Sequence, residues 1–268
     1  MIKDITLGQY FPGSSPIHRL DPRTKLVGMI AYIVIVFLIR QTVVFLLPAL
    51  FVALTVFLAG IPMRYVLRSL KPIRFLLVFM FVINLFMVKT GDPLVSFWII
   101  RITTGGVRQS VFITLRLVML LMGTSLMTLT TTPIALTDGL ERLLLPLSKL
   151  RFPAHELAMM MTIALRFIPT LIEEADKIMK AQMARGADFE SGNLLKRAKS
   201  MVPVLVPLFI SAFRRADELA MAMESRCYHC GEGRTRLHVL RFRRADGVAA
   251  LSFLGLTAAI MLAQRVLA

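Results

Sequence analysis

Apolar residues gather into five long runs, which are separated by short basic or turn-forming segments. A helix needs about 20 apolar residues to cross a bilayer, so each run is predicted to span it. The first run is short, and Lys25 and Arg40 at its two ends would extend it by reaching to the interfaces. Residues 94–106 alternate loosely around Trp98 and are predicted to form an interfacial hairpin or a short re-entrant piece. The five runs are residues 26–39, 43–60, 73–88, 107–129 and 248–262.

The stretch between the fourth and fifth runs has a different pattern. Residues 134–150 place leucines on one stripe and charges elsewhere, which predicts an amphipathic helix along the membrane surface. Two long helical patterns follow, at residues 154–185 and 194–226. Pro203 and Pro207 predict a kink in the second of them.

The two long patterns end alike. Residues 175–186 and 216–227 align, and each places an arginine, Arg185 or Arg226, between two small residues near the predicted helix end. Gly186 stands where a left-handed helix cap is expected. Such an arginine can enter a groove on a partner, or it can merely gain roughly 0.3–1 kcal/mol from the helix macrodipole. The two ends alone leave both explanations open.

Composition places the chain among membrane proteins. Hydrophobic residues make up 56% of it and charged residues 18%, and the mean hydropathy is +0.71, which is too apolar for an ordinary soluble domain. The formal charge is nevertheless +16. Cytoplasmic loops collect Lys and Arg, and the short basic flanks predict a cytoplasmic N-terminus. No nucleic-acid-binding motif accompanies the charge, so no nucleic acid partner is expected.

These patterns predict an all-α polytopic membrane protein with about five transmembrane helices and a large cytoplasmic helical domain. The predicted boundaries are an N-terminal transmembrane domain of four spans, a cytoplasmic domain that carries the two arginine-tipped helices, and a C-terminal transmembrane helix. They correspond to residues 1–131, 132–245 and 246–268.

The sequence offers little for catalysis. It contains no GxxxxGK[ST] segment and no His, Cys and carboxylate cluster, so no catalytic, cofactor-binding or metal-binding residue is predicted and no cofactor is expected. Cys227 and Cys230 form a lone CxxC; zinc would need a second pair of ligands, and both a bystander pair and a metal or redox role stay open. Arg116 lies inside the fourth run, where a functional role, snorkelling to an interface and pairing inside the bundle are all open.

Two similar knobs on one asymmetric chain indicate a partner with two similar sockets. A dimer of like subunits with near two-fold symmetry offers such a pair. The ATPase subunits of ABC transporters are such a dimer, and each normally receives one docking helix from the membrane partner.

Several segments resemble the EcfT family, the transmembrane coupling (T) components of energy-coupling factor vitamin transporters. The resemblance covers essentially the whole chain and its spacing. The segments that carry it are Leu20–Lys25, Thr131–Pro133, Gly139–Leu147, Ala184–Phe189 and Glu224–Tyr228.

The resemblance implies a non-enzymatic coupling subunit of a multi-pass prokaryotic inner or plasma membrane protein complex. Two cytoplasmic ABC ATPase subunits, expected to form a heterodimer, would clasp its coupling domain, and an interchangeable small membrane S component would bind the vitamin. The segment around Cys227 and Gly231 is similar to the shared, multi-vitamin kind of T component. The implied ATPase-docking residues are Ala184, Arg185, Gly186, Ser225, Arg226 and Cys227, and the second triplet departs from Ala-Arg-Gly at both flanks.

Two rival functions remain at this point. A permease of a conventional ABC importer would line the substrate path itself, with one docking helix and a polar site at mid-membrane. A membrane-anchored adaptor would have no transport role. The sequence names no vitamin, because in the favoured interpretation this subunit never binds one.

Overall fold

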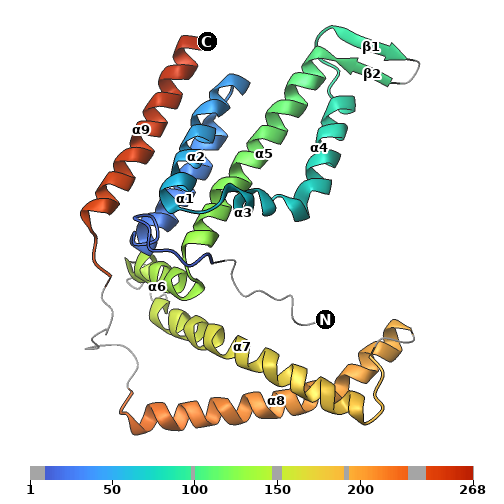
Figure 1. The fold of residues 1–268 in the computed structure, drawn as a ribbon, viewed down its shortest axis with the longest axis vertical. Coiled ribbons are helices and arrows are strands. Elements are labelled where there is room, and N and C mark those ends of the chain that lie inside the picture. Colours follow the sequence, from blue (N-terminus) through green and yellow to red (C-terminus); the bar gives the residue numbers. More distant parts are fainter. Residues whose placement is uncertain (1–9, 98–99, 147–152, 190–192, 229–239, 268) are drawn as a thin grey trace. The chain divides into compact units, whose positions relative to one another are not determined.

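The computed structural model describes residues 10–97, 100–146, 153–189, 193–228 and 240–267. These residues are almost entirely helical, which confirms the predicted all-α class (Figure 1). The chain divides into two compact units. We call residues 8–140 with 240–268 the bundle unit, and residues 141–239 the arm unit.

The bundle unit consists of helices joined by short links and one β-hairpin. Its final helix lies at the C-terminal end of the chain and is separated in sequence from the others by the arm unit. The elements are α1 (Pro22–Leu38), η2 (Thr42–Phe45), α2 (Leu46–Ala59), α3 (Met63–Arg68), η3 (Lys71–Ile73), α4 (Arg74–Met87), β1 (Pro93–Phe97), β2 (Ile100–Thr103), α5 (Thr104–Thr130), α6 (Pro133–Leu144), which continues into the arm unit, and α9 (Arg244–Leu267).

Local caps explain where the principal helices begin. The Asp21 carboxylate accepts a hydrogen bond from the backbone N–H of Arg23, and Pro22 takes the first helical position of α1, where its missing N–H costs nothing. Thr103 caps α5 in the same way, accepting from the N–H of Gly106 at 3.1 Å. Both starts follow from short sequence signals.

The segment predicted as a hairpin or re-entrant piece is a hairpin. Strands β1 and β2 pair antiparallel, with Ser96 opposite Arg101 and Phe97 opposite Ile100. The register shifts between Pro93 and Val95, because proline cannot donate to the ladder.

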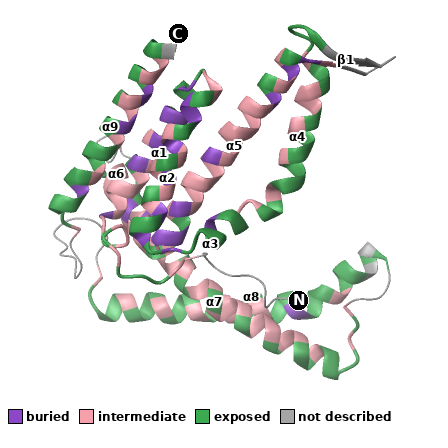
Figure 2. Ribbon diagram, turned by 45° about the horizontal axis from the view of Figure 1, so that its top comes forward, coloured by how far each residue is buried: buried purple, intermediate pink, exposed green. Residues whose placement is uncertain are grey.

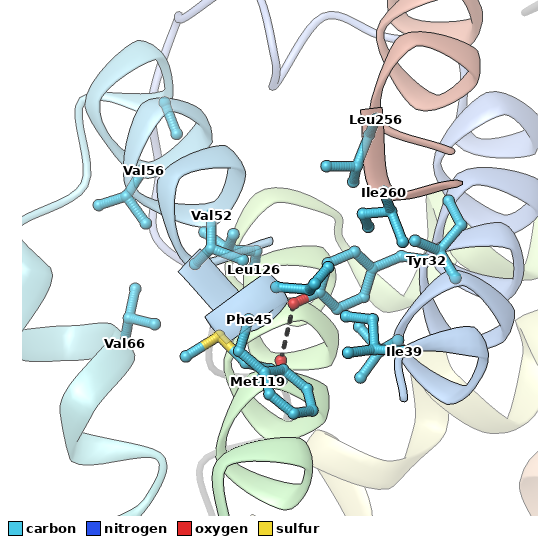
Figure 3. Packing of buried hydrophobic residues seen from close by; sticks show 14 of the residues in the cluster. Tyr32, Ile39, Phe45, Val52, Val56, Val66, Met119, Leu126, Leu256 and Ile260 are labelled. Atoms are coloured by element: carbon cyan, nitrogen blue, oxygen red, sulfur yellow. Dashed lines mark hydrogen bonds between the residues drawn. The ribbon is translucent and has the colours of Figure 1, made fainter. Parts of the chain in front are cut away.

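The core of the bundle unit lies between α1, α2, α5 and α9. Tyr32 of α1 is 3% exposed, and its hydroxyl donates to the carbonyl of Met119 in α5 at 3.0 Å (Figure 3). Gly123, one turn further along α5, lies against the Tyr32 ring so closely that an added Cβ would overlap it. Leu256 and Ile260 of α9 close the same cluster (Figure 3).

The outer faces of this unit are apolar. Phe57 of α2 is 82% exposed and Phe75 of α4 is 79% exposed, and the exposed positions lie on the outward sides of the helices in Figure 2. Such surfaces suit a lipid environment. The bundle unit is therefore built as a membrane domain.

Five helical segments in the described part of the chain are long and apolar enough to cross a membrane, as predicted in number. Four coincide with predicted spans. The fifth is α7 (Ala154–Ala184), which the sequence pattern placed in the cytoplasmic domain, whereas α1, predicted as the first span, has 17 residues and falls short of the usual ~20. The five are Thr42–Ala59, Met63–Met87, Thr104–Thr130, Ala154–Ala184 and Arg244–Val266.

Arg116 has a structural role in the bundle unit. Its guanidinium donates to the carbonyl of Ile39, the C-cap of α1, at 2.7 Å. It also lies over the rings of Phe112 and Phe37, with 4.6 and 5.5 Å to their centroids. Arg116 thus satisfies an orphan helix-end carbonyl and pairs with aromatic faces.

The arm unit contains the two long helices that the sequence predicts, α7 and α8 (Leu194–Ser225). Pro169 lies inside α7, and Pro203 and Pro207 lie inside α8. Each removes one backbone donor, and the first turns of α8 run at an angle to the rest of the helix (Figure 1).

Candidate docking site on two helix ends

The first candidate tip is the C-terminal end of α7. Arg185 is its C-cap, and the chain leaves the helix through Gly186, whose φ of +88° is in the range that favours glycine. The N–H of Gly186 donates to the carbonyl of Met183 at 2.9 Å, and that of Ala187 donates to the carbonyl of Gln182 at 3.0 Å. These are the two hydrogen bonds of a Schellman cap.

The C-terminal end of α8 has the same cap with a different residue. Arg226 is the C-cap, and Cys227 follows with φ +54°. The N–H of Cys227 donates to the carbonyl of Glu224 at 2.8 Å, and that of Tyr228 to the carbonyl of Met223 at 3.0 Å. The departure from Ala-Arg-Gly therefore leaves the backbone geometry intact, with cysteine in a conformation that costs an L-residue about 1–2 kcal/mol.

Both tips project into solvent. Within the described residues, neither the Arg185 nor the Arg226 guanidinium makes an ion pair or hydrogen bond, so its five donors are available to a partner carboxylate or carbonyl. All six residues predicted to dock are exposed: Ala184, Arg185, Gly186, Ser225, Arg226 and Cys227.

The two helices cross, and polar contacts fix the crossing. The Glu174 carboxylate of α7 accepts a hydrogen bond from the Ser211 hydroxyl and pairs with Arg215 at 3.1 Å, both on α8. A groove of ≈ 320 Å³ runs beside this contact, with Phe167 on one wall and Leu219 on the other. No sequence signal indicated these polar contacts, because Glu174 and Arg215 are far apart in the chain.

The crossing sets the separation of the tips. The hydroxyl of Tyr228, just beyond the second tip, donates to the sulfur of Met159 near the start of α7. The first tip lies at the other end of α7, and the two ends point away from the crossing in opposite directions (Figure 1). One helix crossing thus carries two caps with the same hydrogen-bond pattern at a distance from each other.

An exposed apolar stripe on α8 also escaped the sequence analysis, although its spacing of four residues is a readable signal. Large exposed apolar patches mark interaction surfaces. The stripe, which we call the α8 stripe, consists of Met201, Val202, Leu205, Val206, Phe209, Ile210 and Phe213.

The structure buries one of the charged residues predicted for the polar face of residues 134–150. Glu141 was expected on the polar face of the amphipathic helix, but it is 6% exposed and lies 3.0 Å from Nδ1 of His155, because α7 begins beside it. Lys149 and Cys230 lie outside the described residues. Among the described residues no group of three or more His, Cys, Asp and Glu side chains is placed to hold a metal ion.

Comparisons with known proteins extend over nearly the whole chain. The family model CbiQ, described as cobalt transport protein, matches residues 13–237. The chain is 58% identical over 257 residues to the energy-coupling factor transporter transmembrane protein EcfT of Thermosediminibacter oceani, covering 96% of each chain. It is 48% identical to the protein of that name from Bacillus subtilis, covering 96% of this chain and 97% of that one. With the Heliobacterium modesticaldum protein it shares 49% over 267 residues, all of both chains.

Proposed function

The chain belongs to the CbiQ family of cobalt transport proteins, and from its full-length similarity to EcfT proteins we propose that it is the transmembrane coupling subunit of an energy-coupling factor importer. The observation that carries the proposal is the pair of exposed arginines on identical caps at the ends of one crossed helix pair. A conventional permease needs one docking helix, and this chain presents two.

The partners follow from the two tips. Two ABC ATPase subunits, related but not identical, would each receive one tip, and the different residues Gly186 and Cys227 suit sockets that differ slightly. A small, interchangeable membrane S component would bind the vitamin and rest on this subunit. In this arrangement ATP is hydrolysed by the partners, and the chain itself is not catalytic.

The orientation in the membrane is part of the proposal. The N-terminus is cytoplasmic, α1 crosses the membrane, and α7 belongs to the cytoplasmic arm. Support for α1 comes from its four buried residues in the bundle core, which hold it beside α5 and α9. Support for α7 comes from its packing on α8 and from the charged second half that contains Glu174.

Transmission then proceeds through the arm. Closure of the ATPase dimer on ATP would bring its two sockets together and move the tips that they hold. Because Glu174 and Arg215 join the helices at the crossing, a change in tip separation rotates one helix against the other. The surface that carries the S component would turn with them.

Co-purification tests the proposal directly. The tagged chain, expressed with candidate ATPase and S subunits, should retain two ATPase subunits and one small membrane protein in a single complex. The double charge reversal Arg185→Glu and Arg226→Glu should release the ATPases. The matched reversal Arg166→Glu and Arg214→Glu, at exposed positions on the same two helices, should retain them.

Either of two results would refute the coupling role. One is a complex that contains two copies of this chain and no separate S subunit, which a conventional permease would give. The other is loss of the ATPases in both double variants alike, which would assign binding to overall charge and not to the tips.

A further inference from the structure

A lateral pocket of ≈ 430 Å³ lies inside the bundle unit between α1, α2, α5 and α9. Its volume is in the range of small-molecule sites, about 300–1,000 Å³. Leu54, Leu58 and Val248 on its rim are 54%, 49% and 67% exposed, so the pocket opens sideways through the apolar outer surface. The walls include Met29, Tyr32, Phe51, Leu126 and Phe253.

Three of the four serine and threonine hydroxyls in the pocket wall donate to carbonyls of their own helices, and the Tyr32 hydroxyl donates to Met119; the fourth, Thr24, lies next to Lys25 at one end. Thr55 donates to the carbonyl of Phe51 at 2.7 Å, Thr130 to that of Leu126 at 2.8 Å, and Ser252 to that of Ala249 at 2.7 Å. A bound water or polar solute needs two to four polar partners. The wall favours an apolar chain instead.

One end of the pocket carries a cation. The ammonium of Lys25 donates to the carbonyls of His18 and Thr130 at 3.2 and 2.8 Å, which leaves one of its three N–H groups for a ligand. The pocket is therefore apolar along most of its wall and carries a positive charge at one end.

Two carboxylates near this end, Asp21 and Asp246, already have partners within the protein. Asp21 is bound by the Arg23 guanidinium, which lies 4.1 Å from the centroid of the Phe242 ring. Asp246 accepts from the backbone N–H groups of Asp21 and Arg243 at 2.9 and 2.7 Å. Four exposed arginines at this end make no ion pair with a described residue: Arg19, Arg241, Arg243 and Arg244.

We propose that this pocket binds one acyl chain of an anionic phospholipid, whose phosphate lies against Lys25 and the exposed arginines at the start of α1 and α9. Three observations support this occupant: a largely apolar wall whose hydroxyls, apart from Thr24 at the charged end, have partners within the protein, an opening toward the apolar outer surface, and a cationic end. Basic pockets between transmembrane helices bind anionic lipid headgroups by this combination. The lipid would fill the space beside α9 and link that helix to α1 and α2.

Native mass spectrometry of the purified full-length chain tests the site, with dioleoyl phosphatidylglycerol and dioleoyl phosphatidylcholine as probes. The wild type should retain one phosphatidylglycerol, at least about fivefold more than phosphatidylcholine, since each nearby cation attracts an anionic lipid by ~1 kcal/mol. Ala249→Leu fills the pocket and should reduce phosphatidylglycerol to the phosphatidylcholine level. Ala250→Leu, the same change at the next, exposed position outside the wall, should have no effect.

Two arginine variants and a soluble headgroup probe complete the test. Arg244→Gln should lower phosphatidylglycerol retention about fivefold, while Arg265→Gln at the opposite end of α9 should leave it unchanged. Glycerol phosphate, which has the headgroup chemistry without chains, should not displace the lipid. If Ala249→Leu unfolds early in a melting control, Ser252→Leu at an exposed pocket position replaces it. Equal retention of both lipids, equal effects of the two leucine variants, or displacement by glycerol phosphate would overturn the site.

Discussion

Substitutions at Gly186 and Cys227, the two positive-φ residues of the helix caps, test how backbone conformation stabilises each tip. Cys227 has φ +54°, at the centre of the left-handed well near about +57°. Gly186 has φ +88°, well away from that centre. No described atom lies within 4 Å of a Cβ added at Gly186, so an effect there reports backbone conformation and not crowding.

The magnitudes follow from these angles. Gly186→Ala should destabilise the first cap by about 1–2 kcal/mol, because an L-residue is strained at this φ. Cys227→Gly should stabilise the second cap by about 0.5–1 kcal/mol, since relief of strain is partly offset by the greater freedom of glycine in the open chain. The two substitutions thus have opposite signs at equivalent positions.

Hydrogen–deuterium exchange of the full-length chain measures each cap separately. Peptides from the end of α7 should exchange about 5- to 30-fold faster in Gly186→Ala, and those from the end of α8 about 2- to 5-fold slower in Cys227→Gly. Gly255→Ala, at a helical glycine of α9 with open space around it, is the matched control and should accelerate neither end. Faster exchange at the second tip in Cys227→Gly would refute the reasoning.

Three further changes address coupling and packing. Alanine at Arg185 or Arg226 removes charged hydrogen bonds worth about 1.5–3 kcal/mol each. The double variant should lose far more vitamin uptake than either single variant, because in a single variant the other tip still tethers the ATPase dimer. Uptake by the double variant at the wild-type rate would contradict this. Gly123→Leu should lower the melting temperature, since the new side chain overlaps the Tyr32 ring at a cost of about 1–3 kcal/mol or more; an unchanged melting curve would show that the helices separate freely. Glu174→Gln removes the ion pair at the crossing and should broaden the distance distribution between spin labels at the two tips, whereas an unchanged distribution would assign the crossing to apolar packing alone.

Local signals made the helix ends predictable from sequence. Arg185 followed by Gly186 is a cap signature within one turn, and the structure places the helix end there. The equivalent cap at Cys227 was visible only through the alignment of the two ends, because cysteine gives no preference for positive φ. The Asp21-Pro22 helix start was likewise readable from two adjacent residues.

Contacts between distant segments could not be predicted in the same way. Asp246 binds the backbone of Asp21 across 225 positions, and no local pattern relates the two. The burial of Glu141 has the same origin, since it depends on His155 at the start of the next helix. The packing of α1 has the same origin, because its buried residues lie against α5 and α9, which are distant in sequence.

The two units bury very different amounts of apolar surface, and this difference bears on how motion would pass through the molecule. The bundle unit has a continuous cluster of buried side chains from α1, α2, α5 and α9, including Tyr32 and Ile260. In the arm unit the buried hydrophobic residues among those described are Ala154, Ala158 and Val204. Regions with few buried apolar contacts open at lower free energy. A force applied at the two tips would therefore change the angle between α7 and α8 before it deformed the bundle, which is the property that a coupling arm on a membrane anchor requires.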